Sequence, residues 1–316
     1  MMDVDDDIEI FRPDYPAVTF LNHYEIGVIH FVIVLFFILN QILFFISFYR
    51  LRNNLNSTSY KIIKYHGVLS FIQQLCHFIT SIRTIVGMVP EDLLNAATGS
   101  ILNGSFMGCV ALILILTLNR CDIMFNNSVL PGINRETFYN IAIILCYIYS
   151  ILLTTLYSIP CFNMTFDLYH YEWTYRGDYS CAIIGFEYET KSVLTFLGIS
   201  TILYIIMFLK LMHLRSFSST NNIVEVKDIK FLIHALMCFV SLIVLEILWN
   251  DVFADIYMLQ VTSMIPQLIF IFTSGSNTLF TFCFVKEIRD DVINLLSCKH
   301  LNKGKVRNIV NKPNVV

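Results

Sequence analysis

The side chains best suited to chemistry in this sequence are hydrogen-bonding groups set at regular intervals within apolar segments. In residues 62–87 they recur every three or four positions, which places them in one stripe along a helix: His66, Ser70, Gln73, His77, Ser81 and Thr84. Residues 258–285 carry a second stripe of the same kind: Gln260, Ser263, Gln267, Ser274, Asn277 and Thr281. Such groups either bond to one another between helices or line a polar interior. Both interpretations remain open for the two stripes.

Further polar and aromatic candidates lie in neighbouring apolar segments. Asn103 and Met107 fall at similar depths in the segment 99–119 and could line a cavity. Glu246 and Trp249 lie near the end of the segment 229–250. Glu246 and Arg83 could pair with each other, contact a ligand or extend to water at the membrane surface.

The sequence contains no motif that indicates an enzyme or a metal site. The sequence holds no phosphate-binding loop and no nucleophile elbow. Its eight histidines do not form a metal-binding pair four residues apart, and His66 and His77 are about three helical turns apart. We therefore expect neither an enzyme, nor a cofactor, nor a metal site.

The elements that must position these side chains are membrane-spanning helices. The 316 residues are 56% hydrophobic and only 14% charged, with a mean hydropathy of +0.66. This composition excludes a disordered chain and a basic nucleic-acid binder. Apolar runs long enough to span a bilayer predict an all-α membrane protein, a seven-transmembrane helix bundle. The predicted helices are 24–48, 62–87, 99–119, 139–160, 192–212, 229–250 and 258–285.

Charge predicts the orientation of the bundle. With the N-terminus outside, 17 of the 21 basic residues but only 7 of the 24 acidic residues lie on the inner side. The inner face then carries a net charge of +10 and the outer face −13, as the positive-inside rule requires. The ends fit this orientation: we expect an acidic outer tail at 1–23, an amphipathic helix on the membrane surface at 286–297 and a basic inner tail at 298–316. The basic tail would be attracted to anionic membrane lipid or stay disordered.

Several smaller signals agree with this topology. Of nine cysteines only Cys161 and Cys181 fall in an outer loop, so we expect them to form a disulfide, with two free thiols as the alternative. Asn163 heads a glycosylation signal in the same loop, and Cys298 is a palmitoylation candidate. Small residues at four-residue spacing predict that the third helix is central and approached closely by a neighbour: Ser100, Gly104 and Gly108.

Short motifs around these features resemble a known family. Leu118-Asn119-Arg120 ends the third helix, and Phe284-Val285-Lys286-Glu287-Ile288-Arg289 follows the seventh. The outer loop reads Pro160-Cys161-Phe162 and then Tyr171-Glu172-Trp173-Thr174-Tyr175. Over about residues 24–297 the chain is similar to the nematode serpentine chemoreceptors, which are G-protein-coupled receptors, and most similar to class x. The resemblance implies a rhodopsin-like arrangement of the seven helices.

The resemblance implies a sensory role in the plasma membrane, including ciliary membranes of sensory neurons. A small external chemical would bind between the outer halves of the helices, at Asn103, Met107, Glu246, Trp249, Gln260 and Gln267. A heterotrimeric G protein would couple inside at Arg120, for which a positive-inside anchor is the alternative role. Asn119 replaces the acid found there in rhodopsin-like receptors, so no ionic lock by the neighbouring acid is expected. A multi-pass transporter of a small solute is the alternative function.

Overall fold

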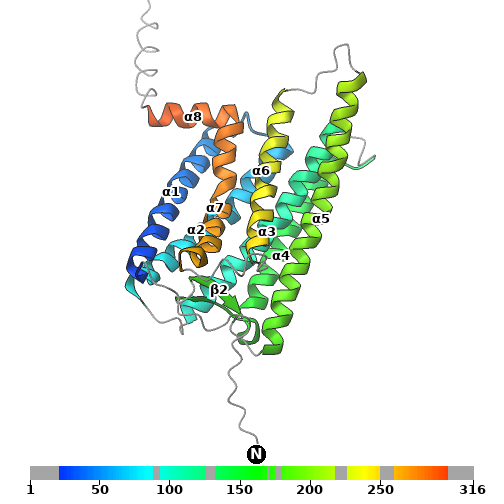
Figure 1. Cartoon of the computed structure of the whole chain (residues 1–316). Coiled ribbons are helices and arrows are strands. Elements are labelled where there is room, and N and C mark those ends of the chain that lie inside the picture. The colour runs from blue at the N-terminus through cyan, green and yellow to red at the C-terminus, as the bar shows by residue number, and fades with distance from the viewer. Residues whose placement is uncertain are drawn as a thin grey trace, which may run out of the picture.

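The computed structural model describes residues 21–87, 93–125, 132–168, 171–175, 179–217, 226–249 and 260–297. Its elements are α1 (His23–Arg50), α2 (Thr58–Val86), α3 (Leu93–Met124), α4 (Arg135–Tyr157), the 3-10 helix η1 (Pro160–Phe162), β1 (Met164–Asp167), β2 (Glu172–Tyr175), α5 (Tyr179–Phe217), α6 (Val226–Trp249), α7 (Gln260–Phe284) and α8 (Lys286–Leu296). Helices α1 to α7 form a bundle (Figure 1). We call the end where β1 and β2 lie the hairpin end, and the end that α8 crosses the α8 end.

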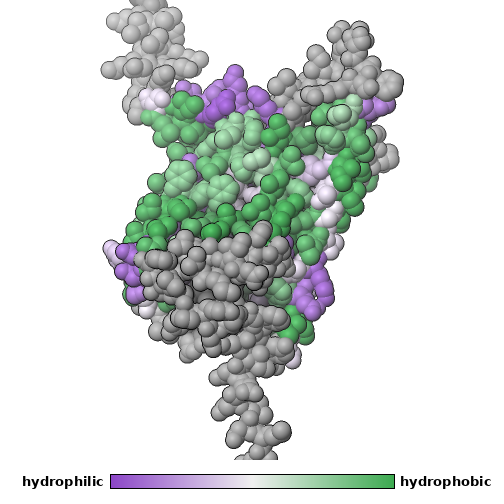
Figure 2. Space-filling view, in the orientation of Figure 1, coloured by the Kyte–Doolittle hydropathy of each residue, from purple (hydrophilic) through white to green (hydrophobic). Residues whose placement is uncertain are grey.

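Six described helices are long and apolar enough to cross a membrane, and α2 is not one of them. The polar stripe of α2 lowers its hydropathy, but all six stripe residues are buried. Because α2 packs against α1, α3 and α7, its polar face lies inside the bundle. The predicted seven-helix bundle is therefore confirmed. Figure 2 shows the apolar band around its middle, with hydrophilic side chains toward the α8 end.

Helix α3 is the central element of the bundle. In its most apolar stretch 78% of the residues are buried, compared with 22% in α5. A side chain at Gly104 would overlap the Thr154 hydroxyl of α4, and the Ser100 hydroxyl donates to the Tyr157 carbonyl oxygen at 2.7 Å. The predicted close approach along the small residues of α3 is therefore present, and α4 is the neighbour that makes it.

The fifth helix differs most from its expected extent. It begins at Tyr179 rather than near residue 192. The predicted range 192–212 covers only part of the helix, which continues beyond it at both ends. On its exposed face Glu187 and Lys191 form an ion pair at four-residue spacing, with 2.5 Å between Oε2 and Nζ. Such pairs support a helix where it leaves the membrane.

The loop between α4 and α5 holds a β-hairpin that the sequence did not predict. Strands β1 and β2 pair antiparallel, with Met164 opposite Tyr175 and Asp167 opposite Glu172. Four-residue strands are too short to give a clear alternating pattern. A disulfide joins Cys161 to Cys181, whose Cα atoms are 5.5 Å apart, so the predicted bridge is present. It ties the chain just before the hairpin to the first turn of α5.

Candidate functional site

The hairpin covers one end of the bundle and is held there by α3. The Asn95 side chain accepts a hydrogen bond from the Phe166 backbone N–H at 3.3 Å and donates to the Phe166 carbonyl at 3.5 Å. Asn95 thus occupies the place of a neighbouring strand. Gly99, one turn along α3, has no room for a side chain, because a Cβ there would overlap the Met164 carbonyl oxygen. The hairpin is therefore seated directly on the helix.

Beneath the hairpin three elements meet at a buried carboxylate. Asn103 Nδ2 of α3 donates to Glu189 Oε2 of α5 at 2.9 Å, and the Tyr175 hydroxyl of β2 donates to the same oxygen. Asn103 Nδ2 also lies 3.2 Å from the Tyr175 hydroxyl. Glu189 is only 6% exposed. Asn103 was a predicted site residue, whereas Glu189 and Tyr175 were missed.

A sequence signal for Glu189 does exist. Val193 and Leu197 follow it at four-residue spacing, and both are buried on the same face of α5. Extending that apolar face backward by one turn reaches Glu189 and indicates that its side chain points inward. The signal was hidden because an acid near the end of a span is normally assigned to water.

Aromatic rings fill the space between α3, α6 and α7, about one helical turn along α3 from Asn103. Trp249 packs edge-on against Phe106 and Phe270, with ring centroids 5.4 and 4.8 Å away, and Phe106 lies 5.4 Å from Phe270. We call these three rings the aromatic trio. Met107 is fully buried in the same apolar cluster. The structure thus brings the predicted residues Met107 and Trp249 together.

A second polar position adjoins Phe270 of the aromatic trio. Gln267 Nε2 of α7 is 3.3 Å from His77 Nδ1 of α2, and the His77 ring meets Phe270 edge-on at 4.8 Å. His30 of α1 is buried nearby, within electrostatic range of His77. The predicted residues Asn103 and Gln267 therefore contact different polar partners.

The remaining predicted ligand residues are less informative. Glu246 is buried toward the hairpin end of α6 and is 6% exposed. Gln260 is the first residue of α7, but its side chain lies outside the part of the structure that is described. The same holds for Ser263 of the α7 stripe.

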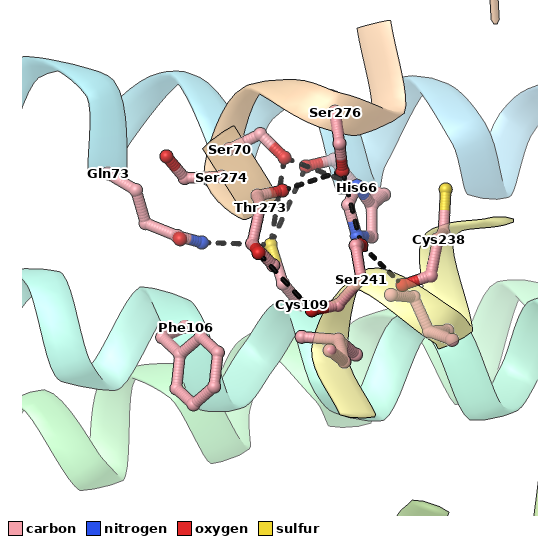
Figure 3. A pocket seen from close by; sticks show the side chains of 12 residues that line it. His66, Ser70, Gln73, Phe106, Cys109, Cys238, Ser241, Thr273, Ser274 and Ser276 are labelled. Carbon is pink, nitrogen blue, oxygen red and sulfur yellow. Dashed lines mark hydrogen bonds between the residues drawn. The ribbon is translucent and has the colours of Figure 1, made fainter. Parts of the chain in front are cut away.

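Deeper in the bundle a small cavity lies between α2, α3, α6 and α7 (Figure 3). Cys109 accepts a hydrogen bond from Gln73 Nε2 at 3.1 Å and lies 3.8 Å from the Ser70 hydroxyl. Across the cavity the Ser241 and Ser276 hydroxyls are 3.5 Å apart. The space is about large enough for one water molecule. The polar stripes of α2 and α7 therefore do face a shared interior, which is nearly closed.

At the α8 end the predicted switch residues are buried. Asn119 Oδ1 accepts a hydrogen bond from the Ser59 hydroxyl of α2 at 2.7 Å. Arg120 is 5% exposed and lies within electrostatic range of Tyr204 of α5 and His234 of α6. Asp122, the nearest acid along the chain, pairs instead with Arg135 of α4 at 2.8 Å.

The other predicted sites can be placed only in part. Asn163 directly precedes β1 and is half-buried. Cys298 lies outside the described residues. Within the described residues, no group of three His, Cys, Asp or Glu side chains is arranged to hold a metal ion.

Comparisons with known proteins agree with this architecture. A family model described as "Serpentine type 7TM GPCR chemoreceptor Srt" matches residues 18–305. The crystal structure of squid rhodopsin superposes with a TM-score of 0.70 at 10% sequence identity, over 89% of this chain and 86% of that chain. At that identity the likeness shows the fold alone. No curated protein matches the sequence.

Proposed function

The chain belongs to the serpentine type 7TM GPCR chemoreceptor Srt family, and we propose that it is a chemosensory receptor that binds a small external chemical and signals to a heterotrimeric G protein. The observation that carries this proposal is the family match over residues 18–305. The serpentine resemblance of the motifs is thereby confirmed. The class expected from them, class x, is not confirmed, because the matching model is that of Srt.

The proposed orientation places the hairpin end outside the plasma membrane and the α8 end in the cytoplasm. The positive-inside rule supports this, because 17 of the 21 basic residues would then be cytoplasmic or near the cytoplasmic surface. The disulfide supports it independently. Structural disulfides persist on the oxidising outer side, and Cys161 and Cys181 are at the hairpin end.

The proposed ligand region lies between the outer halves of the helices, beneath the hairpin. Buried hydrogen-bonding groups beside an aromatic surface suit a small organic molecule, and Asn103, Trp249 and Gln267 supply both. Rings fill this region in the structure. A ligand therefore needs a conformation in which the outer halves of the helices are further apart. It must bind that open conformation more tightly than the closed one.

The proposed signalling end is the α8 end. Arg120 is buried between α3, α5 and α6, so a G protein can reach it only if the inner ends of these helices separate. The same movement would present the basic segment 210–230 to the partner. Coupling between the two ends then does not require a continuous chain of contacts. It requires a bundle with two conformations and a ligand that shifts the equilibrium between them.

Expression in a cell line with calcium and cyclic-nucleotide reporters tests this function directly. A chemical panel should evoke responses that need both the receptor and a G protein, and disappear when the G protein is inhibited. Solute uptake into receptor vesicles, measured with the same panel, provides the contrast. Uptake of a panel chemical without any G-protein response would establish the transporter alternative and overturn the receptor.

A further inference from the structure

Glu189 is a buried carboxylate whose hydrogen-bond partners among the described residues are all neutral. Both hydrogen bonds that it receives, from the Asn103 amide and the Tyr175 hydroxyl, go to Oε2. Among the described residues no lysine or arginine forms an ion pair with it. The closest base along α5, Lys191, pairs with Glu187 at the surface, where the two side chains are 73% and 55% exposed.

An ionised side chain is costly in this arrangement unless a cation completes it or the acid takes up a proton. A carboxylate removed from water loses solvation that two neutral donors replace only in part. An apolar residue would hold the hairpin against α3 and α5 without that cost. A buried acid about three helical turns into α5, beneath the hairpin, is therefore better explained by a positive partner that binds and leaves.

The surroundings of Glu189 suit an ammonium group in particular. The Tyr157 side chain is fully buried, and its ring centroid lies 6.0 Å from that of Tyr175. Phenol rings present negative faces that attract a cation. A carboxylate beside such rings recognises a small protonated amine, because the carboxylate accepts its N–H groups and the rings contact its carbon atoms.

We propose that Glu189 is the counter-ion for the ammonium group of a small primary or secondary amine, which is the class of chemical that this receptor detects. Asn103 and Tyr175 are positioning residues that orient the carboxylate when no ligand is bound. The proposal rests on the receptor function proposed above. The competing explanation is that Glu189 only fastens the hairpin to α3 and α5.

The experiment compares the wild type with Glu189→Gln, which keeps the shape and one acceptor but removes the charge. Glu187→Gln is the matched control, because it removes a charge two residues away on the exposed face of the same helix. The probes are aliphatic and aromatic amines, each paired with the alcohol of the same carbon skeleton. Cell responses and the thermal stability of the purified, lipid-reconstituted receptor are measured for every pair.

We expect amines, and not their paired alcohols, to activate the wild type and to raise its melting temperature. Glu189→Gln should raise the half-maximal concentration of active amines about ten- to a hundredfold, as expected for losing a charged hydrogen bond. Glu187→Gln should respond as the wild type does. Surface labelling must show equal delivery. Should Glu189→Gln be poorly delivered, Glu189→Asp keeps the charge and should keep the preference for amines over alcohols.

The outcomes separate this proposal from the receptor function. If only neutral or acidic chemicals activate the receptor, or if Glu189→Gln responds normally to amines, the amine site is wrong and the receptor function stands. If amines stabilise the purified wild type but not Glu189→Gln, and no response is ever seen in cells, the amine site stands and the receptor function fails. The amine site is also wrong if Glu189→Asp reaches the surface normally but does not prefer amines over alcohols. It is wrong, too, if amines neither activate the wild-type receptor nor raise its melting temperature.

Discussion

The Ser150 hydroxyl of α4 donates a hydrogen bond of 2.8 Å to the backbone carbonyl of Gly104 on α3. Two helices can approach this closely only where one of them lacks a side chain. We predict that Gly104→Ala destabilises the receptor by about 1–3 kcal/mol, the usual cost of forcing extra atoms into a packed interior.

The matched control for that substitution is Gly198→Ala on α5. A Cβ at Gly198 would meet no atom within 4 Å, so this variant should be at least as stable as the wild type, because alanine favours a helix more than glycine does. Thermal denaturation of the purified proteins measures both. If Gly104→Ala is as stable as the wild type, α3 and α4 are further apart at Gly104 than in the structure.

Arg120→Ala should abolish the G-protein response while leaving surface delivery normal, because its guanidinium is the group proposed to meet the partner. Reporter assays and surface labelling measure the two properties in the same cells. Arg50→Ala is the control, since Arg50 also carries positive charge at the α8 end and lies 3.4 Å from Asp291 of α8. An equal loss of delivery in both variants would favour the positive-inside anchor.

The disulfide predicts the outcome of thiol labelling from outside the cell. Cys161 and Cys181 should react with an impermeant maleimide only after reduction, and the variant with serine at both positions should not react there at all. Removing the bridge should cost about 3 kcal/mol, because it closes a loop of about 20 residues in the unfolded chain. Reaction of the wild type without reductant would contradict the bridge.

Trp249→Ala should lower the potency of an activating chemical by about tenfold, equivalent to about 1.4 kcal/mol, because it removes the ring that packs on both Phe106 and Phe270. Trp249→Phe keeps an aromatic side chain and should retain most of the potency. Dose–response curves at matched surface levels compare them. Equal potency of all three proteins would place the ligand away from the aromatic trio.

Sequence reasoning succeeded where the pattern is periodic and the surroundings are uniform. Apolar runs identify helices because a bilayer imposes a minimum length on them. The two polar stripes, with Gln73 on α2 and Gln267 on α7, point inward because lipid cannot satisfy amides. Small residues on α3 predicted a close neighbour for the same kind of reason. These inferences depend on the lipid bilayer and not on which residue a side chain contacts.

Prediction from the sequence failed where a residue's role depends on a partner that is distant in sequence. Glu189 looks like a residue in water until α5 is extended back to Tyr179 and Asn103 and Tyr175 are placed around it. The hairpin owes its position to the Asn95 clamp on α3 rather than to a strong strand pattern. The nearly closed interior follows from how rings such as Phe106 fit together, which no periodicity encodes.

The disulfide also has a mechanical consequence. Cys181 lies in the first turn of α5, so the hairpin is covalently attached to one end of a continuous 39-residue helix. At 1.5 Å per residue that helix is a lever about 58 Å long, and a tilt of about 5° displaces its far end by about 5 Å. A small displacement of the hairpin would thus be magnified at the α8 end of the bundle.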